Sequence, residues 1–366
     1  MGLVDRGDYE WFSQEQRRVF TETMGDAVAS DPERVGGICR APQYTTLAGG
    51  TGAAAASAAA FRSDVLPLPR QHTEPGERNP DYSGTFVFDN DFPPFGPDAP
   101  ETTTEHGLYK AMPAYGRCRV VCFHPRHDLT LAEMNREDIR RVVETWQAEH
   151  RMLAKDSRIN HVLIFENKGS VVGVSNPHPH GQIYATEFVP PVTVTELASS
   201  REFYAEKRRT LVGAILEQEL RDEVRVIAQN DTSVAFIPYF ARYAHETYIV
   251  PRRPMPSVAD LTPDEADDFT EILHTMLVKF DNLYGISFPY VMAFHQAPTD
   301  GAAHPEYHFH VEFHPPLRYP GVLKYLAGAE TGAGVFLNDT SPEEKAKEFR
   351  AAGNIHYKAT GGQKTA

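Results

Sequence analysis

The feature that most constrains the fold of this 366-residue chain is a pattern of segments that occurs twice. The first copy runs "RVVCFHPRHDLTLAEMNREDIRRVVETWQAEHRM", then "HVLIFEN", then "HPHGQIYA". The second runs "TYIVPRRPMPSVADLTPDEADDFTEILHTMLVKF", then "FPYVMAFHQAP", then "YHFHVEF". Each copy is typical of a strand, a basic turn with proline, an Asp-Leu-Thr tripeptide, an amphipathic helix and two further strands. We therefore predict an α+β fold made by duplication of two units whose sheets join, although strand–helix–strand units are common enough for a chance likeness.

The helices expected in the two copies have clear signals. In the second copy, Thr262, Pro263 and Glu265 supply an N-cap, a first-turn proline and the acid of a capping box. Near the end of the chain, "SPEEKAKEF" predicts another capped helix that starts at Ser341. The apolar stripes consist of Ile139, Val142, Val143, Trp146 and Leu153 in the first helix and of Phe269, Leu273, Met276, Leu277 and Phe280 in the second.

The part of the chain before the first copy is the least regular. "LAGGTGAAAASAAAF" is a low-complexity stretch of small residues, which is typical of a loop or a crossover. Further on, "GTFVFDNDF" alternates like a strand and ends in polar residues at Asn90 and Asp91. We expect three parts: a divergent N-terminal segment 1–78, an N-terminal unit 79–220 and a C-terminal unit 221–366.

Composition excludes several classes of protein. A net charge of −14 argues against nucleic-acid binding, which needs a basic surface, and no run of 18 apolar residues predicts a membrane span. The polar, acidic start of the chain is unlike a signal peptide. Cysteine is limited to Cys39, Cys118 and Cys122, without a CxxC pair. We therefore expect a protein of the reducing cytoplasm, without a disulfide framework.

The segment "GVSNPHPHGQIYA" places His178, His180 and Gln182 at alternate positions, where an extended strand points them to one face. Hydrogen-bonded packing is the usual role of a lone histidine, and a metal site is a second interpretation, since imidazole suits zinc and iron. Nucleophilic catalysis is a third. A neutral imidazole can attack phosphorus and form a labile nitrogen–phosphorus bond, while a nearby glutamine donates to phosphoryl oxygens. One histidine can bind a metal while the next one attacks.

Further histidines fall on the predicted strands and turns of both copies. The first copy has the turn "HPRH", and the second has histidines at alternate positions of "YHFHVEFH". Chance rarely places so many imidazoles in register, so this clustering favours a functional site. These residues are His124, His127, His295, His304, His308, His310 and His314.

The stretch "FENKGSVVGVSNPHPHGQIYA", residues 165–185, resembles the active-site segment of the galactose-1-phosphate uridylyltransferase family. This family is a branch of the histidine-triad superfamily in which glutamine replaces the third histidine. "NPDYSGTFVFDNDF", "RCRVVCFHPRHDLTLAEM", "KFDNLYGISFPYVMAFHQAP" and "PPLRYPGVLKYLAGAE" resemble the same family in the same order, over roughly residues 79–350. The resemblance implies two fused half-barrel α+β units that share a mostly antiparallel sheet.

The resemblance also implies an activity and its residues. A uridylyl group would pass from UDP-glucose to galactose 1-phosphate by double displacement, through a covalent intermediate on His180. Gln182 would bind phosphoryl oxygens, and Ser175 would contact the phosphate region. The other residues that match family contacts are Asn90 and Asp91 for the nucleotide, Asn167 for the substrate, and Lys324, Tyr325 and Glu330 on the sugar side.

The resemblance implies a first metal site, for zinc, that uses His127 and His178. The two cysteines that commonly complete this site are missing, so either His72 or another oxygen or nitrogen donor replaces them, or the site is weak or empty. Two further family features have no clear equivalent: the Arg-Pro-rich phosphate-binding turn at the amino terminus, and a glutamine that reaches across a dimer, expected near Phe336 and Leu337.

A second metal site, for zinc or iron, would use Glu196, His295 and the strand "YHFHVEF". One alignment places His310 and Glu312 at the ligand positions, and a register shifted by two places His308 and His310 there. Both ligand sets stay open at the level of sequence, and His310 belongs to each.

The expected partners are UDP-glucose, a hexose 1-phosphate and a second copy of the chain in a homodimer, with no nucleic acid and no membrane. A related nucleotidyltransferase or phosphorylase with another nucleotide or sugar phosphate is the first alternative. A catalytically silent nucleotide- or metal-binding protein is the second, and the intact motif from Ser175 to Gln182 argues against it.

Overall fold

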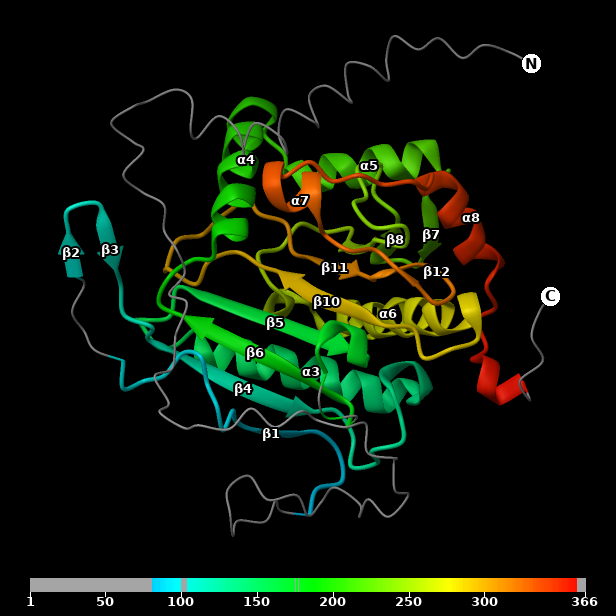
Figure 1. Ribbon diagram of the computed structural model, residues 1–366, viewed down its shortest axis with the longest axis horizontal. Coiled ribbons are helices and arrows are strands. Elements are labelled where there is room, and N and C mark those ends of the chain that lie inside the picture. Colours follow the sequence, from blue (N-terminus) through cyan, green and yellow to red (C-terminus); the bar gives the residue numbers. More distant parts are fainter. Residues whose placement is uncertain (1–80, 100–103, 175, 177, 361–366) are drawn as a thin grey trace.

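The computed structural model describes residues 81–99, 104–174, 176 and 178–360 (Figure 1). Four sequence predictions therefore lie outside the described residues: the divergent segment 1–78, Cys39, His72 and the phosphate contact Ser175.

Nine antiparallel strands form one sheet, in the order β1-β4-β6-β5-β10-β11-β9-β8-β7. The strands are β1 (Phe86–Asp89), β4 (Gly116–Cys122), β5 (His161–Lys168), β6 (His180–Thr186), β7 (Val226–Gln229), β8 (Ser233–Phe236), β9 (Thr247–Pro251), β10 (Tyr290–His295) and β11 (His310–His314). Two short ribbons stand apart from the sheet, β2 (Thr104–His106) with β3 (Tyr109–Ala111) and β12 (Leu317–Tyr319) with β13 (Val322–Leu323). The helices are α3 (Arg136–Leu153), α4 (Pro191–Lys207), α5 (Leu211–Asp222), α6 (Pro263–Tyr284), α7 (Gly328–Ala333) and α8 (Pro342–Ala351).

The strand order contains the predicted duplication. Along the chain, β4, α3, β5 and β6 correspond to β9, α6, β10 and β11. In the sheet, the order β4-β6-β5 is followed by β10-β11-β9, which is the same order reversed, as expected when two similar units meet edge to edge. Strands β5 and β10 join the units, with Phe165 opposite Ala293. The predicted α+β fold, two half-barrel units that share a mostly antiparallel sheet, is confirmed.

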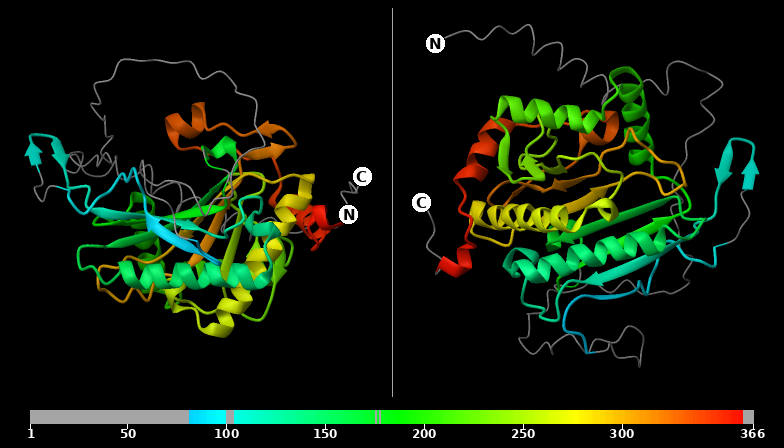
Figure 2. Two further views of the ribbon diagram at one scale, coloured as in Figure 1. Left: turned by 90° about the horizontal axis from the view of Figure 1, so that it is seen from below. Right: turned by 180° about the vertical axis from the view of Figure 1, so that it is seen from behind.

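Helices α3 and α6 lie side by side against one face of the sheet, and α7 and the β12–β13 ribbon lie beyond the other face (Figure 2). The apolar stripes predicted for α3 and α6 are buried against the sheet in the main hydrophobic core. A smaller core lies between α5 and strands β7, β8 and β9. In the first unit, α3 covers one face of the sheet, so polar side chains of the strands can lie on the opposite face.

The predicted end signals of the helices are confirmed. The Thr262 hydroxyl accepts a hydrogen bond from the Glu265 amide, and the Glu265 carboxylate accepts one from the Thr262 amide, which completes the capping box of α6. The helix ends at Gly285 in the left-handed conformation that glycine tolerates best. Ser341 caps α8. Among the described residues, no helix is both long enough and apolar enough to cross a membrane.

Candidate active site and metal centre

The polar residues of the histidine motif share the face of the sheet that α3 does not cover. In β6, Gly181, Ile183 and Ala185 are buried toward the core, whereas His180 and Gln182 alternate with them and are half-buried. Directly paired residues of antiparallel strands point to the same side, and Gln182 is paired with Phe165 on β5. Asn167, two residues further along β5, therefore lies on this face as well.

His180 is held in one tautomer by a backbone contact. Its Nδ1 lies 2.7 Å from the carbonyl oxygen of His178. A carbonyl only accepts hydrogen bonds, so Nδ1 carries the proton and Nε2 keeps its lone pair. This is the state that a nitrogen nucleophile requires, and the backbone fixes the ring before any substrate binds.

His178 supports this arrangement from a buried position. Its backbone N–H donates to the Asn176 side chain at 3.0 Å, and its Nε2 lies 3.1 Å from the Tyr82 hydroxyl. Burial, reinforced by the nearby His180 ring, lowers the pKa of His178 to about 4, so the ring is neutral near pH ~7. No periodic pattern in the segment around Tyr82 marked this residue in the sequence analysis.

Gly181, between the two motif residues, allows a close approach of the core. A Cβ at this position would lie 2.8 Å from Phe123 Cζ and 3.0 Å from the Phe165 carbonyl oxygen. Any side chain would therefore push β6 away from β5 and displace His180 and Gln182 together.

Gln182 is oriented by its neighbour on the same strand face. The Tyr184 hydroxyl donates to Gln182 Oε1 at 3.2 Å, so the amide nitrogen is the end of the side chain that serves as a donor. A carboxamide in this place can donate to a phosphoryl oxygen without taking part in proton transfer.

The residues predicted to contact the nucleotide follow β1. The backbone N–H of Asn90 donates to the Cys118 carbonyl at 2.8 Å, and its side chain accepts from the Phe92 amide at 3.0 Å. This turn fixes Asn90, and Asp91 beside it is exposed. Strands β1, β4 and β6 are neighbours, so the turn belongs to the same half of the sheet as His180.

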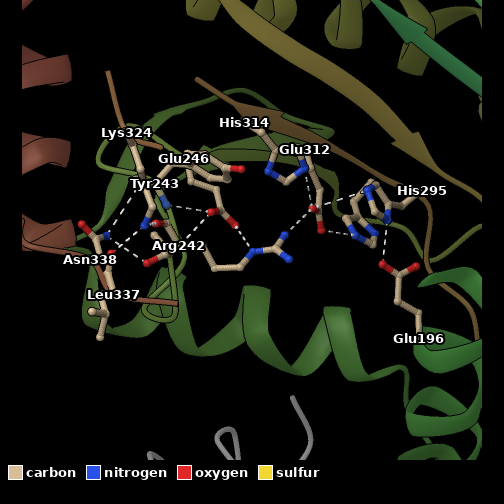
Figure 3. Close-up of polar contacts among 12 residues, drawn as sticks. Glu196, Arg242, Tyr243, Glu246, His295, Glu312, His314, Lys324, Leu337 and Asn338 are labelled. Atoms are coloured by element: carbon tan, nitrogen blue, oxygen red, sulfur yellow. Dashed lines mark hydrogen bonds and ion pairs between the residues drawn. The ribbon is translucent and has the colours of Figure 1, made fainter. Parts of the chain in front are cut away.

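A compact group of four metal-ligating side chains lies in the second unit. One ligand atom from each of Glu196, His295, His310 and Glu312 lies within 4.8 Å of all the others. Strand pairing produces this group, since His295 is opposite His310 and Glu312 is two residues further along β11. Glu196 reaches the group from α4, with its carboxylate 2.7 Å from His295 Nδ1 (Figure 3).

The alternative ligand His308 has other partners. Its Nδ1 lies 3.1 Å from the Thr210 hydroxyl, and its Nε2 lies 2.8 Å from the Pro251 carbonyl oxygen. Both nitrogens of His308 are therefore engaged away from the group. The geometry therefore favours the alignment in which Glu312 accompanies His310, and the metal ligands themselves stay a prediction.

The charges of the group match those of a cation site. Burial by itself would lower the pKa of His295, but the carboxylates of Glu196 and Glu312 raise it to about 9. Glu312 is also buried, yet His295 and hydrogen bonds from His310 and His314 hold its pKa well below its usual range. The carboxylates of Glu196 and Glu312 therefore stay ionised, and their negative charges would stabilise a cation bound between them.

The first predicted metal site has fewer ligands within the part of the chain that the structure describes. His127 and His178 are near enough to interact electrostatically. In residues 81–99, 104–174, 176 and 178–360, however, they are joined by no third histidine, cysteine or acidic side chain in a group of this kind. The donors described here do not form a closed zinc site, which normally has four ligands.

The predicted sugar-side residues divide into buried and exposed ones. The Lys324 ammonium is buried and donates to the carbonyl oxygens of Arg242 and Leu337, both at 2.5 Å, with Glu330 at 3.8 Å. The ammonium of Lys324 is thus engaged by the protein itself, whereas Tyr325 is exposed. Lys324 links the segment after β13 to the turn before β9 (Figure 3).

That turn contributes two residues that the sequence analysis missed. Arg242 and Glu246 precede β9 in an irregular stretch, where no strand or helix period marks them. Their side chains nevertheless lie beside Glu312 (Figure 3). Only the tertiary fold brings them there.

Two family models match this chain. The N-terminal domain of galactose-1-phosphate uridyl transferase matches residues 12–190, and the C-terminal domain matches residues 196–361. The first match begins inside the segment 1–78. The two matches meet between residues 190 and 196, whereas the sequence analysis placed the boundary after residue 220, which stays a prediction.

The chain is also similar to individual proteins of known name. It is 37% identical over 287 residues to a galactose-1-phosphate uridylyltransferase of Rattus norvegicus, a match that covers 77% of this chain and 75% of the rat sequence. The match to the enzyme of the same name from Thermotoga maritima has 35% identity and covers 74% and 85%. A solved uridylyltransferase structure superimposes with a TM-score of 0.73 at 33% identity, covering 81% of this chain and 94% of that one.

Proposed function

Because this chain belongs to the galactose-1-phosphate uridyl transferase family, we propose that it transfers a uridylyl group from UDP-glucose to galactose 1-phosphate. The observation that carries the proposal is the hydrogen bond from His180 Nδ1 to the His178 carbonyl, which leaves Nε2 as a nucleophile. The enzyme is then a UDP-glucose–hexose-1-phosphate uridylyltransferase.

The reaction takes two displacements at one phosphorus atom. His180 Nε2 attacks the α-phosphorus of UDP-glucose, and the bond from this phosphorus to the glucose 1-phosphate oxygen breaks. The electron pair of that bond leaves with glucose 1-phosphate, and the positive charge on the imidazole is shared with the Nδ1–H that donates to His178. In the second step a phosphate oxygen of galactose 1-phosphate attacks the same phosphorus, and His180 leaves with its electron pair. The acceptor is already an anion and needs no general base.

Gln182 stabilises charge in both displacements. Its amide nitrogen donates to a phosphoryl oxygen, and Tyr184 keeps the amide in the orientation that this requires. Ser175 and Asn167 are proposed to contact the substrate, and Asn90 and Asp91 the nucleotide. On the sugar side we propose Tyr325 and Glu330 as contacts, and Lys324 as the residue that holds their segment in place.

The group Glu196, His295, His310 and Glu312 is proposed to bind one zinc or iron(II) ion. Two imidazole nitrogens and two carboxylate oxygens are ligands that suit either metal. When bound, such an ion would cross-link α4, β10 and β11, because its ligands come from these three elements. We propose that the site of His127 and His178 stays incomplete and binds zinc weakly.

We further propose a homodimer in the cytoplasm. The β2–β3 ribbon extends away from the sheet (Figure 1), and Leu108 and Tyr109 near its tip are exposed. An isolated two-stranded ribbon is marginally stable and gains stability from a partner. The buried free thiols of Cys118 and Cys122 fit a reducing compartment.

The test of the proposed reaction is isotope exchange in the absence of the second sugar. Labelled glucose 1-phosphate should exchange into UDP-glucose without galactose 1-phosphate, because the covalent intermediate forms and reverses by itself. A screen of other nucleotide sugars and sugar phosphates in the same assay identifies the substrate pair. Exchange with another pair would favour the related nucleotidyltransferase or phosphorylase. Absence of exchange with every pair would overturn the proposed mechanism.

A further inference from the structure

A second group of ligating side chains adjoins the first and shares Glu312 with it. One ligand atom from each of Glu246, Glu312 and His314 lies within 4.8 Å of the other two. Glu246 is fully buried, and its Oε1 has no hydrogen-bond partner. His314 lies 3.1 Å from Glu312 through Nε2, and its Nδ1 is likewise buried without a hydrogen-bond partner. Unsatisfied buried acceptors of this kind are expected next to a cation.

The guanidinium of Arg242 lies between the two carboxylates of this second group (Figure 3). Its Nη2 is 3.5 Å from Glu312 Oε2, and its Nε is 3.7 Å from Glu246 Oε1. Both distances exceed those of good hydrogen bonds, so the contacts are mainly charge pairs. The Phe336 ring lies 5.3 Å from the guanidinium, a cation–π distance.

The backbone fixes the turn that presents Arg242. Glu246 Oε2 accepts hydrogen bonds from the amides of Arg242, at 2.7 Å, and Tyr243, at 3.1 Å. Lys324 donates to the Arg242 carbonyl at 2.5 Å, and Asn338 donates to the Ala241 carbonyl at 2.9 Å. The side chain of Arg242 therefore starts from a well-defined position.

A charge count explains why an arginine belongs there. The joined groups contain three carboxylates, those of Glu196, Glu246 and Glu312. One divalent ion and one guanidinium balance these three negative charges. Arg242 is the ion-pair partner of the buried Glu246 carboxylate, and its removal would leave that carboxylate without this partner, which is costly in a weakly polar interior.

We propose that Arg242 occupies a second cation position of the metal centre. The natural chain then binds one divalent ion at Glu196, His295, His310 and Glu312, and Arg242→Met binds two. The inference rests on the metal centre proposed above and is independent of the transfer reaction.

The test is zinc binding to metal-free protein, measured by equilibrium dialysis with zinc ions alone. Arg242→Met should bind one equivalent more than the natural chain, and Arg242→Met/Glu246→Gln should lose that extra equivalent. Arg242→Lys retains the charge and should bind as the natural chain does. Arg318→Met is the matched control, since Arg318 is also a partly exposed arginine, is paired with Asp339, and lies outside both groups. Equal zinc content of Arg242→Met and the natural chain would overturn the proposal.

The affinity for the first ion gives a second test, in which Glu246→Gln and Arg242→Gln are informative even if Arg242→Met does not fold well. Glu246→Gln removes a charge but keeps an oxygen that can accept from the two backbone amides, so the turn is retained. If the cluster is balanced as proposed, Glu246→Gln should weaken zinc binding by about tenfold or more, and Arg242→Met or Arg242→Gln should strengthen it. A purely structural role of Arg242 predicts weaker binding in all three, and that result would contradict the proposal.

No difference in zinc content between the natural chain and His310→Gln would overturn the metal centre itself, together with this inference, and would leave the transfer reaction untouched.

Discussion

At the scale of single residues, the chemistry of Gln182 depends on one hydroxyl. Tyr184 engages the carbonyl oxygen of the amide and leaves the nitrogen as the donor. We predict that Gln182→Ala slows uridylyl transfer by about 10²-fold, the usual effect of losing one donor to developing charge. Steady-state rates with both substrates measure this.

Tyr184→Phe is the matched control for that prediction, because it keeps the ring and removes only the orienting hydrogen bond. It should slow transfer by no more than about tenfold, since the amide itself stays in place. Full activity of Gln182→Ala would show that charge stabilisation lies elsewhere in the site.

The sequence identified the residues whose spacing follows a strand. His178, His180 and Gln182, like His310 and Glu312, share a strand face because alternate residues always do. It did not identify Tyr82, Arg242 or Glu246, which reach the sites from irregular segments. The choice between His308 and Glu312 also needed the structure, because the two lie on one strand face and differ only in what surrounds them.

At the scale of elements, the start of α6 is stabilised by Glu265. Its carboxylate closes the capping box and accepts two hydrogen bonds from Arg253, both at 2.7 Å. The Arg253 side chain, together with the Thr262 backbone amide, lowers the pKa of Glu265 to about 2. A depressed folded-state pKa contributes stability that is present above the unfolded value and is lost as the pH falls toward 2.

We therefore predict that Glu265→Gln lowers the free energy of unfolding by about 1 kcal/mol near neutral pH. The difference from the natural chain should shrink as the pH falls below about 4.5, because the natural carboxylate is then progressively protonated in the unfolded state. Urea denaturation across this range measures it. Glu271→Gln is the control on the same helix. Glu271 is exposed, and its ion pair with Arg136, at 3.5 Å, is longer than the hydrogen bonds of Glu265. A constant difference at all pH values would mean that the carboxylate charge is not involved.

The element order was predictable because the two copies carry the same signals in the same sequence. The predicted strand and amphipathic helix are β4 and α3 in the first copy, and β9 and α6 in the second. The Asp-Leu-Thr tripeptide of each copy lies in the short segment that leads into the helix. The two units join through β5 and β10, which is a long-range pairing. No local sequence signal specifies this pairing, and only the general tendency of unpaired sheet edges to associate predicts it.

At the scale of the whole molecule, the metal centre connects α4 to two strands of the sheet. We predict that removing the ion with a chelator lowers the free energy of unfolding by about 3 kcal/mol or more. An ion that binds only the folded state adds its binding free energy to the stability of that state. Thermal denaturation before and after chelation measures this. The transfer rate of chelated protein that is still folded should fall less than its stability does.

Two single variants separate the proposed ligands from their neighbours. His310→Gln should lose zinc and become insensitive to the chelator. His308→Gln should keep its zinc and its chelator sensitivity, since its nitrogens contact Thr210 and Pro251. Zinc loss in His308→Gln alone would show that His308, and not Glu312, accompanies His310 as a ligand.

The proposed mechanism depends on a covalent intermediate on His180, which mass spectrometry after incubation with UDP-glucose alone would detect. We expect release of glucose 1-phosphate in proportion to enzyme, and one uridylyl group on the peptide that contains His180. His180→Gly should remain folded, because the ring is on the open face of β6, and should carry no adduct. An unmodified His180 peptide, together with initial-rate lines that intersect instead of running parallel, would rule out a covalent intermediate on His180.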